Sequence, residues 1–291
     1  MRPTLFRLTL GDQPWPVSSY TFFGVLAALY LLVVLWWMIT RKQPHFLRQH
    51  SKIQFLGLAL ASMASFIIGA RLLYGVLYVS RVQENPSLLW QLQLKNFSLQ
   101  GGLLLVFLLW CLVARRQGLS LFTLTDPLVI HIGIAVAIMR LGCFFNGCCF
   151  GVPTDLPWAV TSRLADGNVI TRLMGVNPIT TGFLGVQLQP RHPTQLYEMA
   201  AGLTASLAAA LALWWPVKND TGFPPAGTGF ATAAFGLVFS LGRLITFFFR
   251  DFPAATTASN VIRGPVVYGL SLVLFSLILK KTGPFTKAYH R

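Results

Sequence analysis

The sequence predicts an all-α integral membrane protein with seven transmembrane helices, an N-terminus outside, a cytoplasmic C-terminus and a small periplasmic head. Three observations lead to this fold class. Hydrophobic residues make up 54% of the 291 residues and charged residues only 11%, whereas soluble domains carry about 25% charged residues. Seven segments have the length and apolar character of a span. The basic residues are also unevenly distributed among the connecting segments.

The predicted spans are apolar segments of roughly 20 residues each. Residues 1–17 lack the ordered basic, apolar and small-residue regions of a cleaved signal peptide, so the first apolar segment is predicted to be a true span. Together the spans predict one membrane-embedded domain over residues 1–291. They cover residues 18–39, 53–79, 99–114, 127–146, 195–216, 228–249 and 262–279.

The net charge of +15 is explained mainly by the orientation of the spans. Short segments that would lie inside carry the pairs Arg41-Lys42, Arg115-Arg116 and Lys280-Lys281, as expected for cytoplasmic loops. A second explanation is attraction to an anionic lipid. Nucleic-acid binding is not predicted, because no basic run is interleaved with aromatic residues. Residues 147–194 form the only long outer segment, and we expect them to form an extracytoplasmic head or lid.

Three arginines, Arg71, Arg140 and Arg243, fall within predicted spans. Each costs about 2.5–3.5 kcal/mol if it lies at the centre of the membrane. Glu198 is the one carboxylate clearly within a span, and we expect it to pair with an arginine rather than to act as an acid or base. Asp126 is explained by helix capping. The excess of arginines predicts an anionic ligand between the helices.

The second and third spans carry two further candidate motifs. Arg71, Tyr74 and Tyr78 lie on one helical stripe, which could bind a phosphate and its glycerol or form an interfacial aromatic belt. Gly101 and Gly102, at the start of the third span, permit close approach of a lipid or of another helix.

The fourth span ends in the stretch from Arg140 to Gly151. Asn146 lies where the helix stops and could donate a hydrogen bond to a phosphate oxygen. His131 is nine residues before Arg140, so it points away from it, and we expect a helix-packing role. No two of the cysteines Cys143, Cys148 and Cys149 have the Cys-x-x-Cys spacing, so no metal site is predicted. Packing, a disulfide or a covalent intermediate remain as alternatives for the three thiols.

The fifth and sixth spans complete the candidate site. Pro193 suits the first turn of a helix, which would direct the positive helix end and Arg191 toward an anion. His192, near the cap, and Tyr197, in the first turns, belong to the same segment. On the sixth span, one face of the helix carries a second stripe, made of Phe239, Arg243, Phe247 and Arg250.

These motifs together resemble the bacterial prolipoprotein diacylglyceryl transferases over nearly the whole chain. The resemblance rests on Arg140-Leu-Gly, Asn146-Gly147 and Gly151, on the complete block Arg191-His-Pro-Thr-Gln-Leu-Tyr-Glu198, and on the Gly-x-Arg-x-x-Tyr stretch that holds Arg71. The arginine stripe that ends at Arg250 also matches.

The resemblance implies transfer of diacylglyceryl from phosphatidylglycerol to the lipobox cysteine thiol of a preprolipoprotein, with release of glycerol phosphate. It implies a monomer in the bacterial cytoplasmic membrane with its active site toward the extracytoplasmic side. No cofactor, metal or nucleic acid is expected. The predicted catalytic residues are Arg140, Arg243 and Gln100. The predicted substrate-binding residues are Arg71, Tyr74, Gly101, Gly102, Asn146, Gly151, Arg191, His192, Gln195, Tyr197, Glu198 and Arg250.

The chain departs from the family pattern at Gln100, where members usually carry the histidine of a His-Gly-Gly motif that is often proposed to help activate the thiol. Phe239 and Phe247 likewise stand where many members have Tyr and Glu. Two alternatives therefore stay open beside the transferase: a divergent member that moves another lipid group or uses another acceptor, and a non-catalytic lipid-binding membrane protein.

Overall fold

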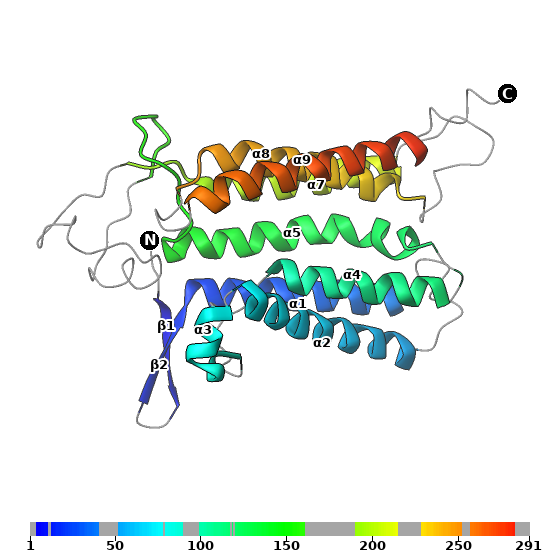
Figure 1. Cartoon of the computed structure of the whole chain (residues 1–291), viewed down its shortest axis with the longest axis horizontal. Coiled ribbons are helices and arrows are strands. Elements are labelled where there is room, and N and C mark those ends of the chain that lie inside the picture. The colour runs from blue at the N-terminus through cyan, green and yellow to red at the C-terminus, as the bar shows by residue number, and fades with distance from the viewer. Residues whose placement is uncertain are drawn as a thin grey trace, which may run out of the picture. The chain divides into compact units, whose positions relative to one another are not determined.

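The computed structural model describes residues 4–10, 13–40, 52–77, 79–89, 99–116, 118, 120–160, 190–214, 228–251 and 257–282. Most of the described residues are helical (Figure 1). The elements, in order, are β1 (Thr4–Leu10), β2 (Gln13–Ser18), α1 (Ser19–Thr40), α2 (Lys52–Leu77), α3 (Val79–Glu84), the 3-10 turn η2 (Pro86–Leu89), α4 (Leu99–Arg116), α5 (Phe122–Asn146), α7 (Thr194–Trp214), α8 (Phe230–Phe248) and α9 (Thr257–Thr282).

Six helices in the described part of the chain are long and apolar enough to cross a membrane. They are α1, α2, α5, α7, α8 and α9, and their bounds agree with six of the seven predicted spans. The predicted third span coincides with α4, a helix of 18 residues that is not among the six. The structure thus supports a multi-pass membrane protein, while the seventh span and the orientation stay predictions.

The first described residues form a β-hairpin, which the sequence did not predict. β1 and β2 pair in an antiparallel register that runs from Thr4 opposite Ser18 to Leu10 opposite Gln13. The hairpin was not predicted because β2 contains Pro14 and Pro16, and proline argues against a strand. A two-stranded sheet has only edges, where proline is tolerated.

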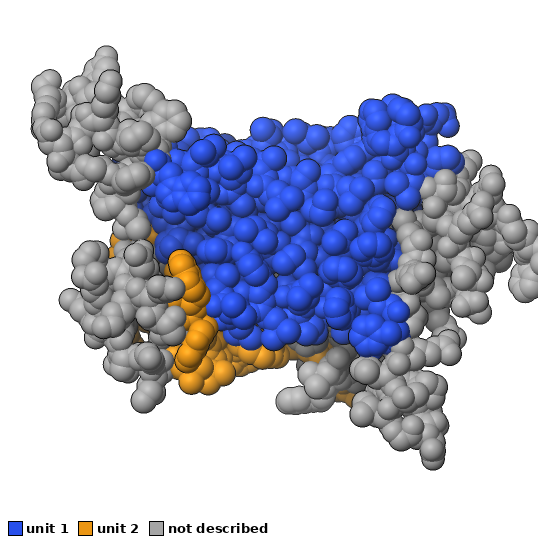
Figure 2. Space-filling view, turned by 180° about the vertical axis from the view of Figure 1, so that it is seen from behind, with its two compact units in different colours: residues 1–35, 125–291 blue, residues 36–124 orange. Residues whose placement is uncertain are grey.

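The chain divides into two compact units (Figure 2). Unit 2 comprises residues 36–124, and in it α2 packs closely against α4. A Cβ on Gly101 would lie 2.2 Å from the backbone oxygen of Gly69, so only glycine permits this approach. Trp110 Nε1 also donates a hydrogen bond to Ser62 Oγ at 2.9 Å. These contacts explain Gly101 as a helix-packing residue.

Unit 1 comprises residues 1–35 and 125–291, and within it α7 touches both α5 and α8 through small residues. A Cβ on Gly133 would lie 2.3 Å from the backbone oxygen of Gly202, and a Cβ on Gly242 would lie 2.5 Å from Cβ of Ala201. Ser206 Oγ donates to Ile130 O at 2.7 Å. Such small-residue contacts are typical of helix packing in membranes, where backbones approach closely.

The two faces of α7 differ in residue size. Its buried stripe includes Ala201, Ala205, Ala209 and Ala212, whereas Leu203, Leu207, Leu211 and Trp214 are exposed. Small residues therefore face the protein and large apolar ones face outward, the arrangement expected of a helix surrounded by lipid.

Two polar contacts inside unit 1 confirm sequence-based interpretations. Asp126 is fully buried and accepts hydrogen bonds from the N–H groups of Gly229 and Thr232, at 2.9 and 3.0 Å. It caps the N-terminus of α8 rather than that of its own helix. His131 Nδ1 lies 2.8 Å from Tyr30 Oη, which satisfies the histidine between α1 and α5 as predicted.

Candidate active site

Glu198, in the second turn of α7, is the centre of a cluster of charges. Its carboxylate Oε2 lies 2.5 Å from Arg140 Nε, and Oε1 forms ion pairs with Arg243 and, at 3.3 Å, with Arg250 NH1. The Glu198 side chain is only 3% exposed. Pairing of Glu198 with an arginine is confirmed. Because three guanidinium groups share one carboxylate, these four residues hold two more positive charges than negative ones.

The small-residue helix contacts bring this cluster together. Gly202 lies one turn after Glu198 on α7, Gly133 lies two turns before Arg140 on α5, and Gly242 directly precedes Arg243 on α8. Close backbone approach at these points lets the short Glu198 side chain reach arginines on two other helices.

Tyr268, on α9, orients Arg243. Its hydroxyl accepts hydrogen bonds from Arg243 Nε at 3.2 Å and from NH2 at 2.9 Å, and its ring centroid lies 5.5 Å from the Arg243 Cζ. No sequence motif indicated Tyr268. A single tyrosine in an apolar helix carries no signal of its own, although an unpaired arginine on α8 required a partner on a neighbouring helix.

The segment after α5 turns back sharply beside the cluster. Gly147 has φ 72°, and its N–H donates to Phe144 O while the N–H of Cys148 donates to Cys143 O, both at 3.2 Å. These two bonds form a Schellman motif, which ends a helix with a left-handed glycine. The motif explains why the helix stops at Asn146.

Gly151 is required where this segment meets the end of α8. It forms an isolated bridge with Arg250, and its N–H donates to His192 O at 2.9 Å. A Cβ at this position would lie 2.2 Å from the Phe249 backbone oxygen and 2.7 Å from His192 Cβ. Only glycine therefore fits at this position, between the end of α8 and His192.

The start of α7 holds the same segment from the other side. Thr194 Oγ1 donates to Cys149 O at 2.7 Å, and Gln195 Nε2 donates to Cys148 O at 2.6 Å. Gln195 is 1% exposed, and its Oε1 accepts no hydrogen bond from the described residues. A buried amide oxygen without a donor is costly, so Oε1 is suited to accept a hydrogen bond from a bound molecule.

Arg191 and His192 are engaged by protein groups. Arg191 NH1 lies 2.5 Å from Asp251 Oδ2 and 3.2 Å from Gly151 O. His192 Nδ1 lies 3.1 Å from Tyr197 Oη, which in turn accepts a hydrogen bond from Trp158 Nε1 at 2.8 Å. Arg191 thus contacts an anion of the protein itself, and any role toward a lipid stays a prediction.

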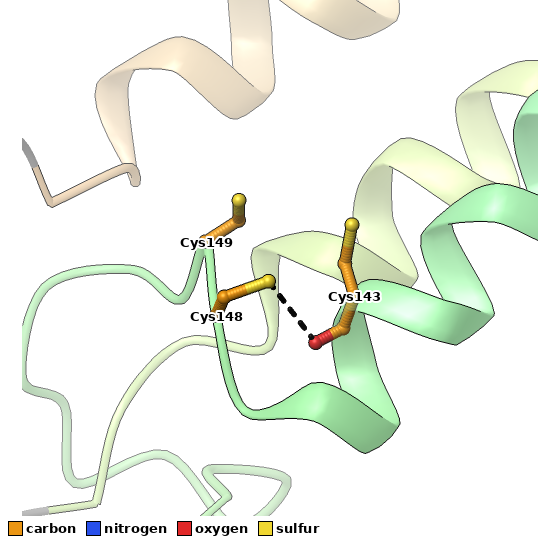
Figure 3. A group of neighbouring side chains, drawn as sticks. All are labelled: Cys143, Cys148 and Cys149. Carbon is orange, nitrogen blue, oxygen red and sulfur yellow. Dashed lines mark hydrogen bonds between the residues drawn. The ribbon is translucent and has the colours of Figure 1, made fainter. Parts of the chain in front are cut away.

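Three thiols, of Cys143, Cys148 and Cys149, gather at the end of α5 (Figure 3). Cys143 belongs to the last turn of α5, and the Cys148 side chain points back toward it, with Sγ 3.7 Å from Cys143 O. Arg140 NH1 lies 3.9 Å from Cys143 Sγ. Hydrogen bonds with the thiols of Cys143 and Cys148 lower the pKa of Cys149, with Arg250 and Arg140 adding to the effect and burial opposing it. All three cysteines are free, so the predicted disulfide alternative is not observed.

The predicted residues Arg71, Tyr74, Gln100 and Gly102 belong to unit 2. Arg71 is half-buried and Tyr74 is buried on α2, and Gly102 contacts Phe66 within unit 2. The side chain of Gln100, like the whole of Tyr78, lies outside the described residues, as do residues 161–189 of the predicted head. Their roles stay predictions.

Residues 5–280 match the model of the prolipoprotein diacylglyceryl transferase family. The chain belongs to this family. It is 24% identical to the phosphatidylglycerol–prolipoprotein diacylglyceryl transferase of Clostridium tetani over 87% of each chain. It is also 30% identical to the enzyme of the same name from Azotobacter vinelandii, over 74% of this chain and 71% of the relative.

A further relative carries the same name. The Bordetella avium enzyme is 32% identical over 65% of this chain and 62% of its own length. These matches confirm the resemblance found in the sequence and place the chain among the diacylglyceryl transferases, as predicted. The cluster of Glu198, Arg140, Arg243 and Arg250 therefore belongs to a member of a transferase family.

Proposed function

We propose that this chain, a diacylglyceryl transferase by family, transfers diacylglyceryl from phosphatidylglycerol to a cysteine thiol of a prolipoprotein at the Glu198 cluster. These substrates are the ones after which the related enzymes are named. The observation that carries the proposal is the excess of positive charge on Arg140, Arg243 and Arg250 over Glu198. The three arginine side chains are only 14–24% exposed, so this excess favours binding of an anion, and a phosphodiester supplies one.

The transfer is a displacement at the glycerol carbon that carries the phosphate ester. The thiol sulfur forms a bond to this carbon, the carbon–oxygen bond to phosphate breaks, and its electron pair leaves with glycerol phosphate. The thiol proton passes to water in the same reaction. Negative charge grows on the leaving phosphate, so Arg140 and Arg243 act by stabilising that charge.

Glu198 keeps the arginines in place while no substrate is bound. A guanidinium group forms fork-like hydrogen bonds with carboxylates and with phosphates alike. In the contacts described above, Arg140 and Arg243 use only some of their five donors on Glu198 and Tyr268, and we expect the other donors to bind phosphate oxygens. Tyr268 fixes the plane of the Arg243 group, so little rotational freedom is lost when the lipid binds.

Gln195 and Gly151 suit the positioning of the polar part of the lipid. Gln195 Oε1 is buried and lacks a donor among the described residues, so it can accept a hydrogen bond from a glycerol hydroxyl or from the incoming thiol. Gly151 brings the backbone of its segment against the end of α8. For the residues of unit 2, including Gln100, Arg71 and Tyr74, we propose lipid binding on the basis of the sequence motifs.

For the whole protein we propose seven spans, with α4 as the third, and an N-terminus outside. The reaction then takes place on the extracytoplasmic side of the bacterial cytoplasmic membrane, in a monomer, with residues 147–194 as a head over the site. The cationic ends of α4 and α9 support a cytoplasmic location for these ends.

Complementation tests the proposal. The chain is expressed in a bacterium depleted of its own diacylglyceryl transferase, and growth and lipoprotein modification are measured. We expect rescue by the parent chain and none by Arg243→Ala at equal membrane levels. Absence of rescue by a well-expressed parent chain, together with no glycerol phosphate release from phosphatidylglycerol in vitro, would contradict the proposal.

A further inference from the structure

We propose that Cys143, Cys148 and Cys149 bind one soft metal ion, Cu(I) or Zn(II), through their three thiolates. The proposal rests on the position of the three sulfur atoms, which all lie within 4.8 Å of one another. The proposed metal site takes no part in the transfer reaction, and it is tested by measuring how much metal the protein binds.

The distances fit a three-sulfur site. A metal–thiolate bond is about 2.3 Å long, so three sulfurs around one ion in a plane lie about 4 Å apart. The thiols therefore need to approach one another by less than about 1 Å to reach this geometry. Sulfur donors favour Cu(I) and Zn(II) over the oxygen-binding cations.

The backbone prepares this arrangement. The Schellman motif around Gly147 reverses the chain and returns Cys148 to the last turn of α5, beside Cys143. Cys149 has φ 64°, a left-handed conformation that is uncommon for a residue other than glycine. Hydrogen bonds from Thr194 and Gln195 to the two cysteine carbonyls fix the segment from outside, so little ordering is needed when an ion binds.

The surrounding charge also fits. Three thiolates and one Cu(I) carry two negative charges, and with Zn(II) they carry one. Arg140 NH1 lies 3.9 Å from Cys143 Sγ, so one guanidinium group stands next to this negative charge. A charged group next to the sulfur is the kind of outer contact that supports metal ligands. The site would clamp the end of α5 to the segment that follows it.

The spacing of the cysteines explains why the sequence did not indicate a metal. Positions 143, 148 and 149 do not form a Cys-x-x-Cys pair, and two of the ligands are adjacent in the chain. Only the helix-ending turn places the first of them beside the other two.

Metal retention by the full-length protein tests the inference. The protein is purified in detergent under reducing conditions, loaded with Zn(II) or, without oxygen, with Cu(I), desalted, and analysed for metal content. We expect about one ion per chain for the parent protein, and at least a tenfold reduction in Cys148→Ser and Cys149→Ser. Cys111→Ser is the matched control, since Cys111 lies on α4 in unit 2, and it should retain the ion.

A second measurement separates metal binding from misfolding. The thermal midpoint of the metal-free variants should equal that of the metal-free parent, and metal should raise it in the parent and in Cys111→Ser only. Failure of the parent to retain either ion would overturn the inference. Equal retention in Cys149→Ser, or a Cys143–Cys148 disulfide that persists when metal is supplied, would overturn it as well.

Discussion

Glu198 and Arg140 form an ion pair in which carboxylate Oε2 lies 2.5 Å from guanidinium Nε. This ion pair connects α7 to α5, and the same carboxylate also forms an ion pair with Arg243 on α8. One acidic residue thus positions cations from two helices, and it does so at a point almost closed to solvent. Single substitutions of Glu198 and of the residues around it therefore test this arrangement.

Replacing Arg243 by alanine should reduce the transfer rate by about 100- to 1,000-fold, the usual effect of removing one donor that stabilises developing charge. The measurement is glycerol phosphate release from phosphatidylglycerol, with kcat and KM determined separately. Arg115→Ala is the control, because Arg115 is exposed in the last turn of α4. A kcat for Arg243→Ala within a factor of three of the parent value would exclude the proposed role.

Replacing Glu198, which is 3% exposed, by glutamine should lower the free energy of unfolding by about 3–5 kcal/mol, because the half-buried Arg140 and Arg243 lose their counter-charge. Thermal unfolding in detergent would show a lower midpoint. Glu84→Gln is a suitable comparison, since Glu84 is exposed on α3, and it should change little. If the two variants were equally stable, the ion pairs of Glu198 would make no net contribution to the free energy of unfolding.

Replacing Gly133 by leucine should separate α5 from α7 and abolish activity. Even a Cβ here would lie 2.1 Å from Ser206 Oγ and 2.3 Å from the Gly202 backbone oxygen. Activity and yield of folded protein are measured together. Gly269→Leu serves as the control, because a Cβ on Gly269 of α9 has no atom within 4 Å; full activity of the Gly133 variant would refute the close contact.

Replacing Asp126 by alanine should destabilise the protein by about 1–3 kcal/mol, because the N–H groups at the start of α8 lose a buried acceptor. Hydrogen exchange should increase at the first turn of α8 before it increases elsewhere. The exposed Asp155 supplies the control substitution. Unchanged exchange in this turn would mean that water replaces the cap.

Replacing Gln100 by histidine should increase the transfer rate by about 100-fold, the lower end of the range for a positioned base. Glutamine cannot accept a proton at neutral pH, whereas histidine has a pKa near 6.5, so the increase should appear as the pH rises through about 6.5. Gln100→Asn is the control, as it retains the amide. An unchanged rate with histidine would mean that proton removal does not limit this enzyme.

The sequence predicted the charged centre of the site because charges are expensive in an apolar chain. Arg140, Arg243 and Glu198 stood out for that reason, and the structure joins them. Tyr268 was missed, since a hydroxyl in an apolar helix costs little and gives no pattern. Asp126 was recognised as a cap, but the helix that it caps begins about a hundred residues later, and no local pattern specifies such a partner. The hairpin was missed because proline lowers the strand propensity of β2. Each strand of a two-stranded sheet is an edge strand, and proline is tolerated there.

The alanine and leucine stripes of α7 separate what holds the charges from what meets the membrane. Backbone contacts at Gly133, Gly202 and Gly242 set the position of Glu198, while Leu203 and Leu207 face away from them. Evolution can therefore exchange the outward residues to suit bilayers of different thickness or fluidity and leave the geometry of the Glu198 cluster untouched. The same freedom allows protein engineers to alter the detergent or lipid compatibility of this chain by changing one helix face alone.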